Sequence, residues 1–253
     1  MKKRLCCFIL AFILIAICQA GCGKKDNGMK KVVLNEVAHS IFYAPQYVAI
    51  EMGYFKDAGI DLVLETGFGA DKTMTALISG NADIGFMGSE STIYAYAEGS
   101  KDYAVNFAGL TQRAGNFLVA REKIDNFSWD MVKGKNVLGG RKGGMPQMVL
   151  EYILKANNID PASDLSIDQS VDFGLTAGAF SGNTEYDFTV EFEPGATSLE
   201  KEGKGYVVAS LGVDSGYVPY TAYSAKKSYI EKNPEIIKDF TSAIQKGLDY
   251  VNS

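Results

Sequence analysis

The sequence predicts an α/β fold in which strands and helices alternate around mostly parallel sheets. Three segments support this prediction: 60–80, the strand at 83–87 with the residues after it, and 135–157. In each, a short apolar run of strand length leads into a glycine-containing turn, and residues with helical spacing follow. Strands that alternate with helices in this way form βαβ units, whose strands pair in parallel.

The segment 135–157 is the most informative of the three. Four glycines fall within the six residues 139–144, with Arg141 and Lys142 between them, and Pro146 stands where the first turn of a helix tolerates proline. The free N–H groups and the dipole at such a helix end favour an anionic or electron-rich ligand group. The turn matches neither a P-loop nor a G-x-G-x-x-G pattern. A plain tight connection between strand and helix is the alternative.

The remaining elements follow from the same patterns. A first strand at 32–34 precedes a loop and a helix that Gly53 ends, and the helix after the strand at 60–65 stops at Gly80. Ser89 is predicted as the N-cap of the helix after 83–87. Further strands are predicted at 103–110, 117–121, 165–167, 187–192, 206–211 and 219–224, and further helices at 175–180 and from Pro194.

The last predicted element is an amphipathic helix. Asn233 is expected as its N-cap, with Pro234 in its first turn. Its apolar face is predicted to consist of Ile237, Phe240, Ile244, Leu248 and Val251.

Residues 1–21 have the pattern of a secretory targeting segment. Three basic residues precede a 14-residue apolar run at 5–18, which is too short to span a bilayer comfortably. Residues 19–25 resemble a bacterial lipoprotein signal with Cys22 as the acylated residue, although Gln19 stands where such signals usually carry Leu. We expect residues 1–21 to be a signal peptide and residues 22–31 to be a lipid tether.

Composition excludes several functions for the rest of the chain. All four cysteines lie within residues 1–22, so the body has no disulfide scaffold, no cysteine zinc site and no cysteine nucleophile. Without residues 1–21 the chain carries 22 basic and 30 acidic residues, and its net charge of −8 argues against nucleic acid as a partner. His39 is the only histidine and no G-x-S-x-G motif occurs. These absences give little basis for catalysis, and we expect no enzyme, no cofactor and no metal.

Four motifs together resemble one protein family. They are F-Y-A-P-Q-Y-V-A-I-E-M-G-Y-F-K-D-A-G-I-D at 42–61, S-G-N-A-D-I-G-F at 79–86, K-G-K-N-V-L-G-G-R-K-G-G at 133–144, and F-E-P-G-A-T-S-L-E-K-E-G-K-G at 192–205. They resemble the substrate-binding proteins of bacterial ABC importers. The nearest branch takes sulfonates, nitrate and thiamine-type pyrimidine precursors, and the similarity covers nearly all of 32–253.

The resemblance implies a two-lobed periplasmic-binding-protein fold of type II, with the ligand between the lobes and two chain crossings as the hinge. We expect residues 32–122 and 212–253 to form lobe 1 and residues 123–211 to form lobe 2. The implied partners are a small-molecule solute and ABC permease and ATPase subunits, with lipid on Cys22 as the only membrane attachment of a monomer outside the cytoplasm. Because family members usually continue for several more helices, we also expect lobe 1 to be truncated.

Ligands of open α/β sheets lie beyond the carboxyl ends of the strands, at helix N-termini. The predicted site therefore combines the turns at 67–71, 88–91 and 140–145 with the loop at 39–43 and with Glu193 from the second lobe. The predicted ligand-binding residues are His39, Phe42, Tyr43, Gly69, Ser89, Glu90, Arg113, Arg141, Lys142, Gly143, Gly144, Glu191 and Glu193.

Several residues of these turns and loops also have an ordinary structural explanation. The alternatives are a loop histidine at His39, core aromatics at Phe42 and Tyr43, helix caps at Asp71 and Ser89, and a solvated charge at Arg113.

Two ligand classes remain open within the resemblance. The cations of the 139–144 turn and three helix N-termini suit a sulfonate, nitrate or phosphate. The aromatic pair Phe42 and Tyr43, with the carboxylates of Glu191 and Glu193, suits an aminopyrimidine, whose protonated ring nitrogen favours a carboxylate. We favour the pyrimidine. A pyrimidine-forming enzyme on the same fold and a ligand-sensing lipoprotein are the alternatives to import, and the enzyme of this branch relies on a cysteine-rich motif that the body lacks.

Overall fold

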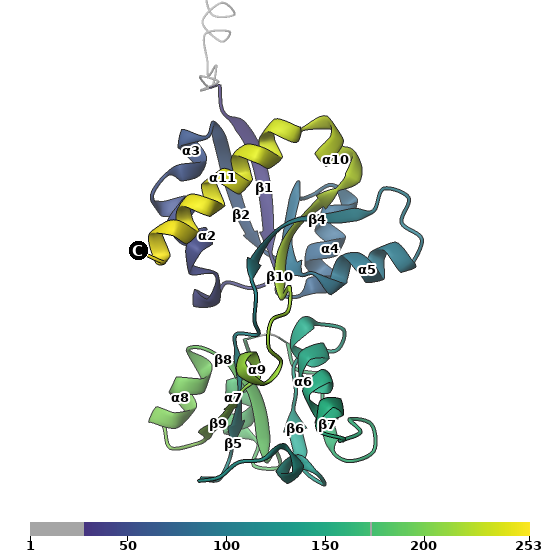
Figure 1. The fold of residues 1–253 in the computed structure, drawn as a ribbon, viewed down its shortest axis with the longest axis vertical. Coiled ribbons are helices and arrows are strands. Elements are labelled where there is room, and N and C mark those ends of the chain that lie inside the picture. Colours follow the sequence, from purple (N-terminus) through teal and green to yellow (C-terminus); the bar gives the residue numbers. More distant parts are fainter. Residues whose placement is uncertain (1–27, 173) are drawn as a thin grey trace, which may run out of the picture. The chain divides into compact units, whose positions relative to one another are not determined.

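The structure is a computed structural model that describes residues 28–172 and 174–253. The predicted signal peptide, Cys22 and most of the tether lie outside the described residues. Residues 31–253 form one compact unit built on two five-stranded sheets (Figure 1). No helix in the described ranges is long and apolar enough to cross a membrane.

The first sheet has the strand order β2-β1-β3-β10-β4. Strands β1 and β3 are parallel, and β10 is antiparallel to both β3 and β4. Its strands are β1 (Lys30–Glu36), β2 (Ile60–Thr66), β3 (Ile84–Gly88), β4 (Ala104–Thr111) and β10 (Thr221–Lys226). The helical segments of this half are η1 (Ile41–Tyr43), α2 (Ala44–Glu51), α3 (Tyr54–Asp57), α4 (Ala70–Ser79), α5 (Glu90–Ala97), α10 (Lys227–Lys232) and α11 (Pro234–Val251).

The second sheet has the strand order β7-β6-β8-β5-β9. Strand β6 is parallel to β7 and β8, whereas β5 is antiparallel to β8 and β9. Its strands are β5 (Asn116–Ala120), β6 (Asn136–Leu138), β7 (Ser166–Asp168), β8 (Phe188–Phe192) and β9 (Tyr206–Ser210). The helical segments are η2 (Trp129–Val132), α6 (Met145–Ala156), α7 (Thr176–Gly182), α8 (Gly195–Lys201) and α9 (Leu211–Asp214). The predicted α/β class, with two sheets flanked by helices, is confirmed.

The chain passes between the sheets twice, from β4 to β5 and from α9 to β10 (Figure 1). The two connections are hydrogen-bonded to each other. The Val218 N–H donates to the Gln112 carbonyl at 3.0 Å, and the Thr111 hydroxyl bonds the Thr221 hydroxyl at 2.8 Å. The two connections therefore run side by side as one hydrogen-bonded pair.

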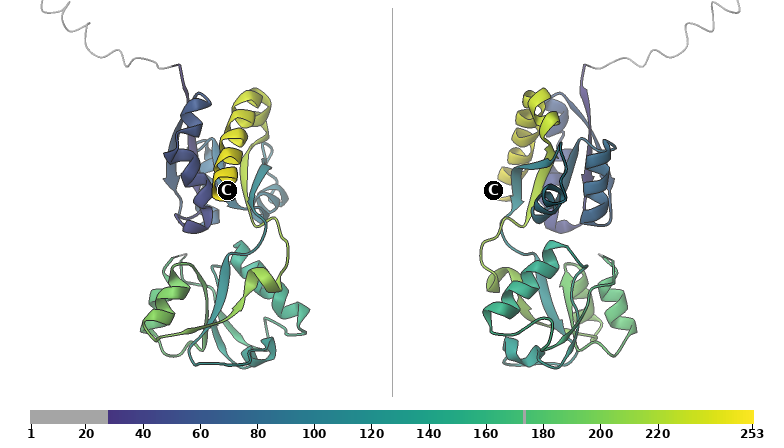
Figure 2. Two further views of the ribbon diagram at one scale, coloured as in Figure 1. Left: turned by 60° about the vertical axis from the view of Figure 1, so that its left-hand side comes forward. Right: turned by 90° about the vertical axis from the view of Figure 1, so that its right-hand side faces the viewer.

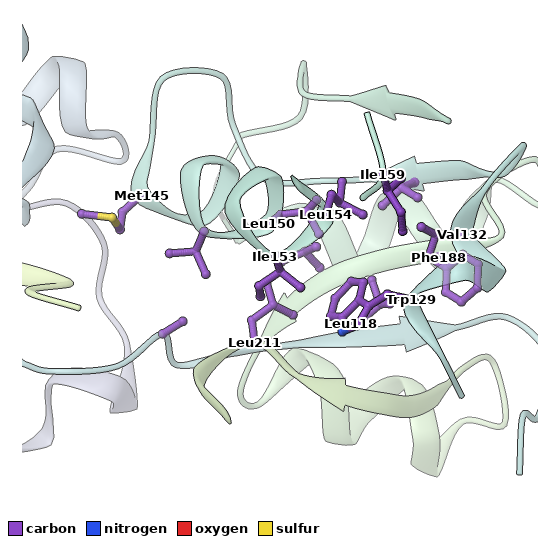
Figure 3. Close-up of a cluster of buried hydrophobic side chains, with 14 of the residues drawn as sticks. Leu118, Trp129, Val132, Met145, Leu150, Ile153, Leu154, Ile159, Phe188 and Leu211 are labelled. Carbon is purple, nitrogen blue, oxygen red and sulfur yellow. The ribbon is translucent and has the colours of Figure 1, made fainter. Parts of the chain in front are cut away.

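Helix α6 covers one face of the second sheet. Its residues Leu150, Ile153 and Leu154 pack with Trp129 and Phe188 in the main core of this half (Figure 3). Met148 and Tyr152 share the helical spacing of the apolar residues of α6, but their side chains are 39% and 56% exposed. The helix instead buries Leu150 and Leu154, because its apolar stripe is wide and the sheet contacts the side that these two residues occupy.

Helix α11 packs on the first half beside α2 (Figure 2). It begins at Pro234 after Asn233 as predicted, although the Asn233 side chain forms no capping bond. Phe240 and Ile244 are buried as predicted, whereas Val251 is 48% exposed. The buried face continues through Gly247, where a side chain would collide with the Pro45 carbonyl of α2. A glycine at this position therefore permits the close approach of the two helices.

Candidate functional site

A cavity of about 450 Å³ is lined by residues from both halves of the fold. The first half contributes one side of α4 and one side of α5. The second half contributes the glycine-rich turn before α6, and the lining also includes Tyr220, which precedes β10, and Thr221, the first residue of β10. The predicted residues among the lining are Tyr43, Gly69, Glu90, Arg141, Lys142, Gly143 and Gly144.

Glu90 is the most unusual residue of the lining. It is the first residue of α5 and is only 2% exposed, yet neither carboxylate oxygen has a hydrogen-bond partner in the described residues. A buried polar group without a partner costs about 1–3 kcal/mol, and more when it is charged. Such a group in a cavity wall is therefore a candidate for ligand contact.

The local chain geometry places this carboxylate. A side chain on Gly88, the last residue of β3, would overlap both Glu90 carboxylate oxygens, so only glycine leaves room for them there. Burial raises the pKa of Glu90 to about 7. Three nearby donors limit this rise in the pKa: the N–H groups of Glu90 and Met145 and the Ser91 side chain. The group can therefore be ionised or protonated near neutral pH, accepting in one form and donating in the other.

Tyrosines surround Glu90. Tyr220 is 3% exposed and its hydroxyl has no hydrogen-bond partner among the described residues. Burial raises the pKa of Tyr220 well above its usual value, and the neighbouring Tyr43 and Glu90 raise it further. Tyr43 is equally buried and lies edge-on to Phe86, with ring centroids 4.6 Å apart. The inner end of the cavity thus combines aromatic surface with unpartnered oxygen atoms.

Arg141 joins the two halves of the fold. Its guanidinium bonds Asp71 of α4 at 2.9 Å and Asp172 of the second half at 2.8 Å. A third contact, at 3.4 Å, runs to the Phe68 carbonyl. The predicted role of Asp71 as a helix cap is wrong, because Gly69 is the N-cap of α4 and the Asp71 carboxylate faces Arg141. Arg141 is therefore already neutralised by protein carboxylates.

Each helix N-terminus at the cavity also has a protein carboxylate close to it. Asp71 lies in the first turn of α4 and Glu90 in the first turn of α5. The Glu90 carboxylate also lies near the first N–H of α6, that of Met145. These positions are the ones that an anionic ligand would use. The charges in the lining are Asp71, Glu90, Glu98, Arg141 and Lys142, which leave one net negative charge.

Comparison with known proteins identifies the family. The family model described as NMT1/THI5 like matches residues 41–253. The chain belongs to this family. YtlA of Bacillus subtilis (strain 168), whose name describes it as a binding protein and gives no ligand, is 49% identical over 242 residues, covering 96% of this chain and 71% of YtlA.

Solved structures show the same fold. The periplasmic aliphatic sulphonate binding protein SsuA from Escherichia coli matches with a TM-score of 0.71 and 17% identity, over 86% of this chain and 72% of SsuA. The periplasmic nitrate-binding protein NrtA from Synechocystis PCC 6803 matches with a TM-score of 0.72 and 17% identity, over 89% of this chain and 63% of NrtA. The predicted resemblance and the two-lobed binding-protein fold are confirmed.

Three predicted residues of the first half lie outside the lining. His39 is an exposed ring that bonds the buried carboxylate of Glu36 at 2.9 Å through Nδ1. Phe42 packs against Phe192 and Tyr220, with ring centroids 5.7 and 5.8 Å away, so it contacts two residues of the lining without lining the cavity itself. Ser89 is the N-cap residue of α5 as predicted, but its hydroxyl donates to the Pro219 carbonyl and forms no capping bond.

The three remaining predicted residues bond to other protein groups in the second half or in the connection between the halves. Arg113 donates to the Gly212 carbonyl at 2.8 Å and lies over the Tyr217 ring. The buried carboxylate of Glu191 accepts bonds from two threonine hydroxyls, and Glu193 accepts from the N–H and hydroxyl of Thr197 in α8. None of the three lines the cavity.

Sequence reasoning missed two features near the site. In the sequence, nothing marked Tyr220 as a site residue beyond its place in the predicted strand at 219–224. Glu36, at the end of β1, is fully buried and receives bonds from Gln46, Tyr47 and Thr66 as well as His39. An isolated glutamate at the end of an apolar strand is the only sequence signal for such a network. No group of three or more His, Cys, Asp or Glu residues arranged to hold a metal ion occurs in the described ranges.

Proposed function

We propose that the chain is the extracytoplasmic solute-binding component of an ABC importer. In this proposal it captures a small solute in the cavity between its two halves and delivers it to a membrane permease and ATPase. Membership of the NMT1/THI5-like family and 49% identity to a protein named as a binding protein support capture rather than catalysis. The fold shared with sulphonate- and nitrate-binding proteins supports import.

We propose a thiamine-type pyrimidine precursor as the solute, in preference to a sulfonate or nitrate. The observation that carries this choice is the buried carboxylate of Glu90, whose two oxygens have no partner in the described residues. An aminopyrimidine offers an amino N–H and, when protonated, a ring N–H, which a carboxylate accepts as a charge-assisted pair. The aromatic rings of Tyr43 and Phe192 in the same lining suit a planar solute.

A sulfonate or nitrate fits these charges less well. An anion at the inner end would meet the Glu90 carboxylate, and like charges in a buried site repel strongly. The Arg141 guanidinium is held by Asp71 and Asp172. Lys142 is exposed and is the remaining cation of the lining. The carboxylate assigned to the ligand is therefore Glu90, in place of Glu191 and Glu193.

A thermal-shift screen tests the choice of solute. The probes are the hydroxymethyl aminopyrimidine precursor of thiamine, taurine, ethanesulfonate and nitrate. A ligand that binds only the folded state raises the melting temperature. We expect the aminopyrimidine alone to do so, and a shift with taurine or nitrate but not with the aminopyrimidine would contradict the proposal.

The lipid anchor has its own test. Cys22→Ser should move the protein from the membrane fraction to the soluble extracytoplasmic fraction. Unchanged membrane association of the variant would contradict anchoring at Cys22.

A further inference from the structure

The lining of the cavity follows two helices along their length. On α4 it includes residues 70, 71, 74, 75 and 78, and on α5 residues 90, 91, 94 and 95 followed by the C-cap residue 98. Both sets have the spacing of one helix face. Because each residue adds 1.5 Å along a helix, eight residues correspond to a length of about 12 Å. The cavity is therefore a groove between two helix faces that extends well beyond the residues around Glu90.

The two ends of this groove differ. The inner end holds the buried, unpartnered oxygens of Glu90 and Tyr220. At the outer end, Ile78 and Tyr94 are 42% and 45% exposed, and Glu98 adds one carboxylate to the lining. The lining also includes the apolar side chains of Met74, Ala95, Met145 and Pro146. A polar head and an apolar body would match these two environments.

We infer that the groove binds an elongated solute whose amidine-like head, formed by two neighbouring N–H groups, lies on Glu90 and Tyr220 and whose apolar body extends between α4 and α5. This inference rests on the proposed function and narrows its substrate class. A single pyrimidine ring would occupy only the inner part of the groove. Substituents that reach towards Ile78 and Tyr94 would bury further apolar surface.

The head group follows from the two oxygens of Glu90. Both are unpartnered in the described residues, and two parallel N–H donors satisfy a carboxylate in a forked pair. Amidines, guanidines and protonated aminopyrimidines carry such a donor pair. The Tyr220 hydroxyl can accept a further N–H or donate to a ring nitrogen. A sulfonate head offers acceptors only, so it could pair with Glu90 only through the single O–H of the protonated carboxyl and would leave the other oxygen unpaired.

A matched series of probes tests the inference. Benzamidine, para-butylbenzamidine and para-hexylbenzamidine share one head and differ in the body, and para-alkylbenzenesulfonates of the same lengths replace the head. Isothermal titration measures each affinity. We expect the dissociation constant of the amidines to fall by about fourfold for each buried methylene. The sulfonates should not bind.

Two variants on α4 separate the groove from the head site. Thr75 is exposed and lines the groove, so Thr75→Trp should obstruct the outer part and abolish the gain from longer alkyl chains while benzamidine still binds. Lys72 is exposed on the same helix and outside the lining, so Lys72→Trp is the matched control and should keep the gain. Glu90→Gln should weaken all three amidines by the same factor, with thermal melts confirming that each variant is folded.

The outcomes distinguish the inference from the proposed function. Equal affinities along the amidine series, or an unchanged gain in Thr75→Trp, would overturn the elongated solute while a Glu90-dependent aminopyrimidine site stands. Failure of the aminopyrimidine and of every amidine to bind would overturn both.

Discussion

Two buried glutamates show how similar burial can support different roles. Glu90 and Glu191 are 2% and 3% exposed, and burial raises the pKa of each to about 7. The Glu191 oxygens accept hydroxyl bonds from Thr176 at 2.9 Å and Thr189 at 2.6 Å. The Glu90 oxygens accept none from the described residues and border a cavity. A satisfied carboxylate stabilises the second half, whereas an unsatisfied one is available to a ligand.

The largest expected difference is in stability. We expect Glu191→Ala to lower the free energy of unfolding by about 3 kcal/mol, because two buried threonine hydroxyls lose their acceptor and a void opens in the core. Glu90→Ala removes no hydrogen bond of good geometry, only the looser approach of the Glu90 and Met145 N–H groups and the Ser91 side chain, and should cost about 1 kcal/mol or less. Urea unfolding at pH 5, where both carboxyls are protonated in the folded protein, provides the measurement. Equal losses would remove the distinction between the two sites.

The pH dependence of stability should show both groups. A carboxyl whose pKa is raised on folding contributes stability below its unfolded pKa of about 4.5, and this contribution is lost as the pH rises through about 7. The rise of the pKa from 4.5 to about 7 on folding corresponds to roughly 3 kcal/mol at most for each group. We expect Glu90→Gln and Glu191→Gln each to flatten part of this decline. A wild-type stability that rises from pH 5 to pH 8 would contradict the raised values.

Gly88→Ala tests the placement of the Glu90 carboxylate. The added methyl group would overlap both carboxylate oxygens, so the side chain must move away from its present position. We expect the affinity for the aminopyrimidine to fall about tenfold, or about 1.4 kcal/mol. Titration calorimetry gives the affinity, and a far-ultraviolet spectrum identical to that of the parent excludes unfolding. An unaltered affinity would show that this geometry is not required.

The smallest expected effect concerns Arg141. Its ion pairs with Asp71 and Asp172 are partly exposed, and such pairs are worth at most about 1 kcal/mol. Since Arg141 joins the two halves, Arg141→Ala should weaken every ligand alike, by up to about fivefold. Selective loss of sulfonate or nitrate binding would instead assign Arg141 to an anion site.

Much of the fold could be predicted from the sequence because its signals are local. Helix α6 begins at Met145 with Pro146 in its first turn, and α11 begins at Pro234, both as expected. The short helices α3, α9 and α10 were not predicted, since four to six residues contain too few turns for a periodic pattern.

The site was less predictable because hydrogen-bond satisfaction depends on distant residues. Glu90 and Glu191 were both candidates, and nothing in the sequence indicates that Thr176 and Thr189 satisfy one of them while no described residue satisfies the other. Arg141 looked free beside its glycines until the structure placed Asp71, seventy positions earlier in the chain, next to it. Tyr220 is a site candidate only because the fold buries it with the core residues of the second half.

The most direct test is titration calorimetry of the parent, Glu90→Gln and Glu191→Gln with the hydroxymethyl aminopyrimidine. A charge-assisted hydrogen bond is worth about 1.5–3 kcal/mol. We therefore expect Glu90→Gln to weaken binding by about one to two powers of ten and Glu191→Gln to leave it unchanged. An affinity that survives in Glu90→Gln, or that is lost equally in both variants, would contradict the assignment of Glu90 to the ligand.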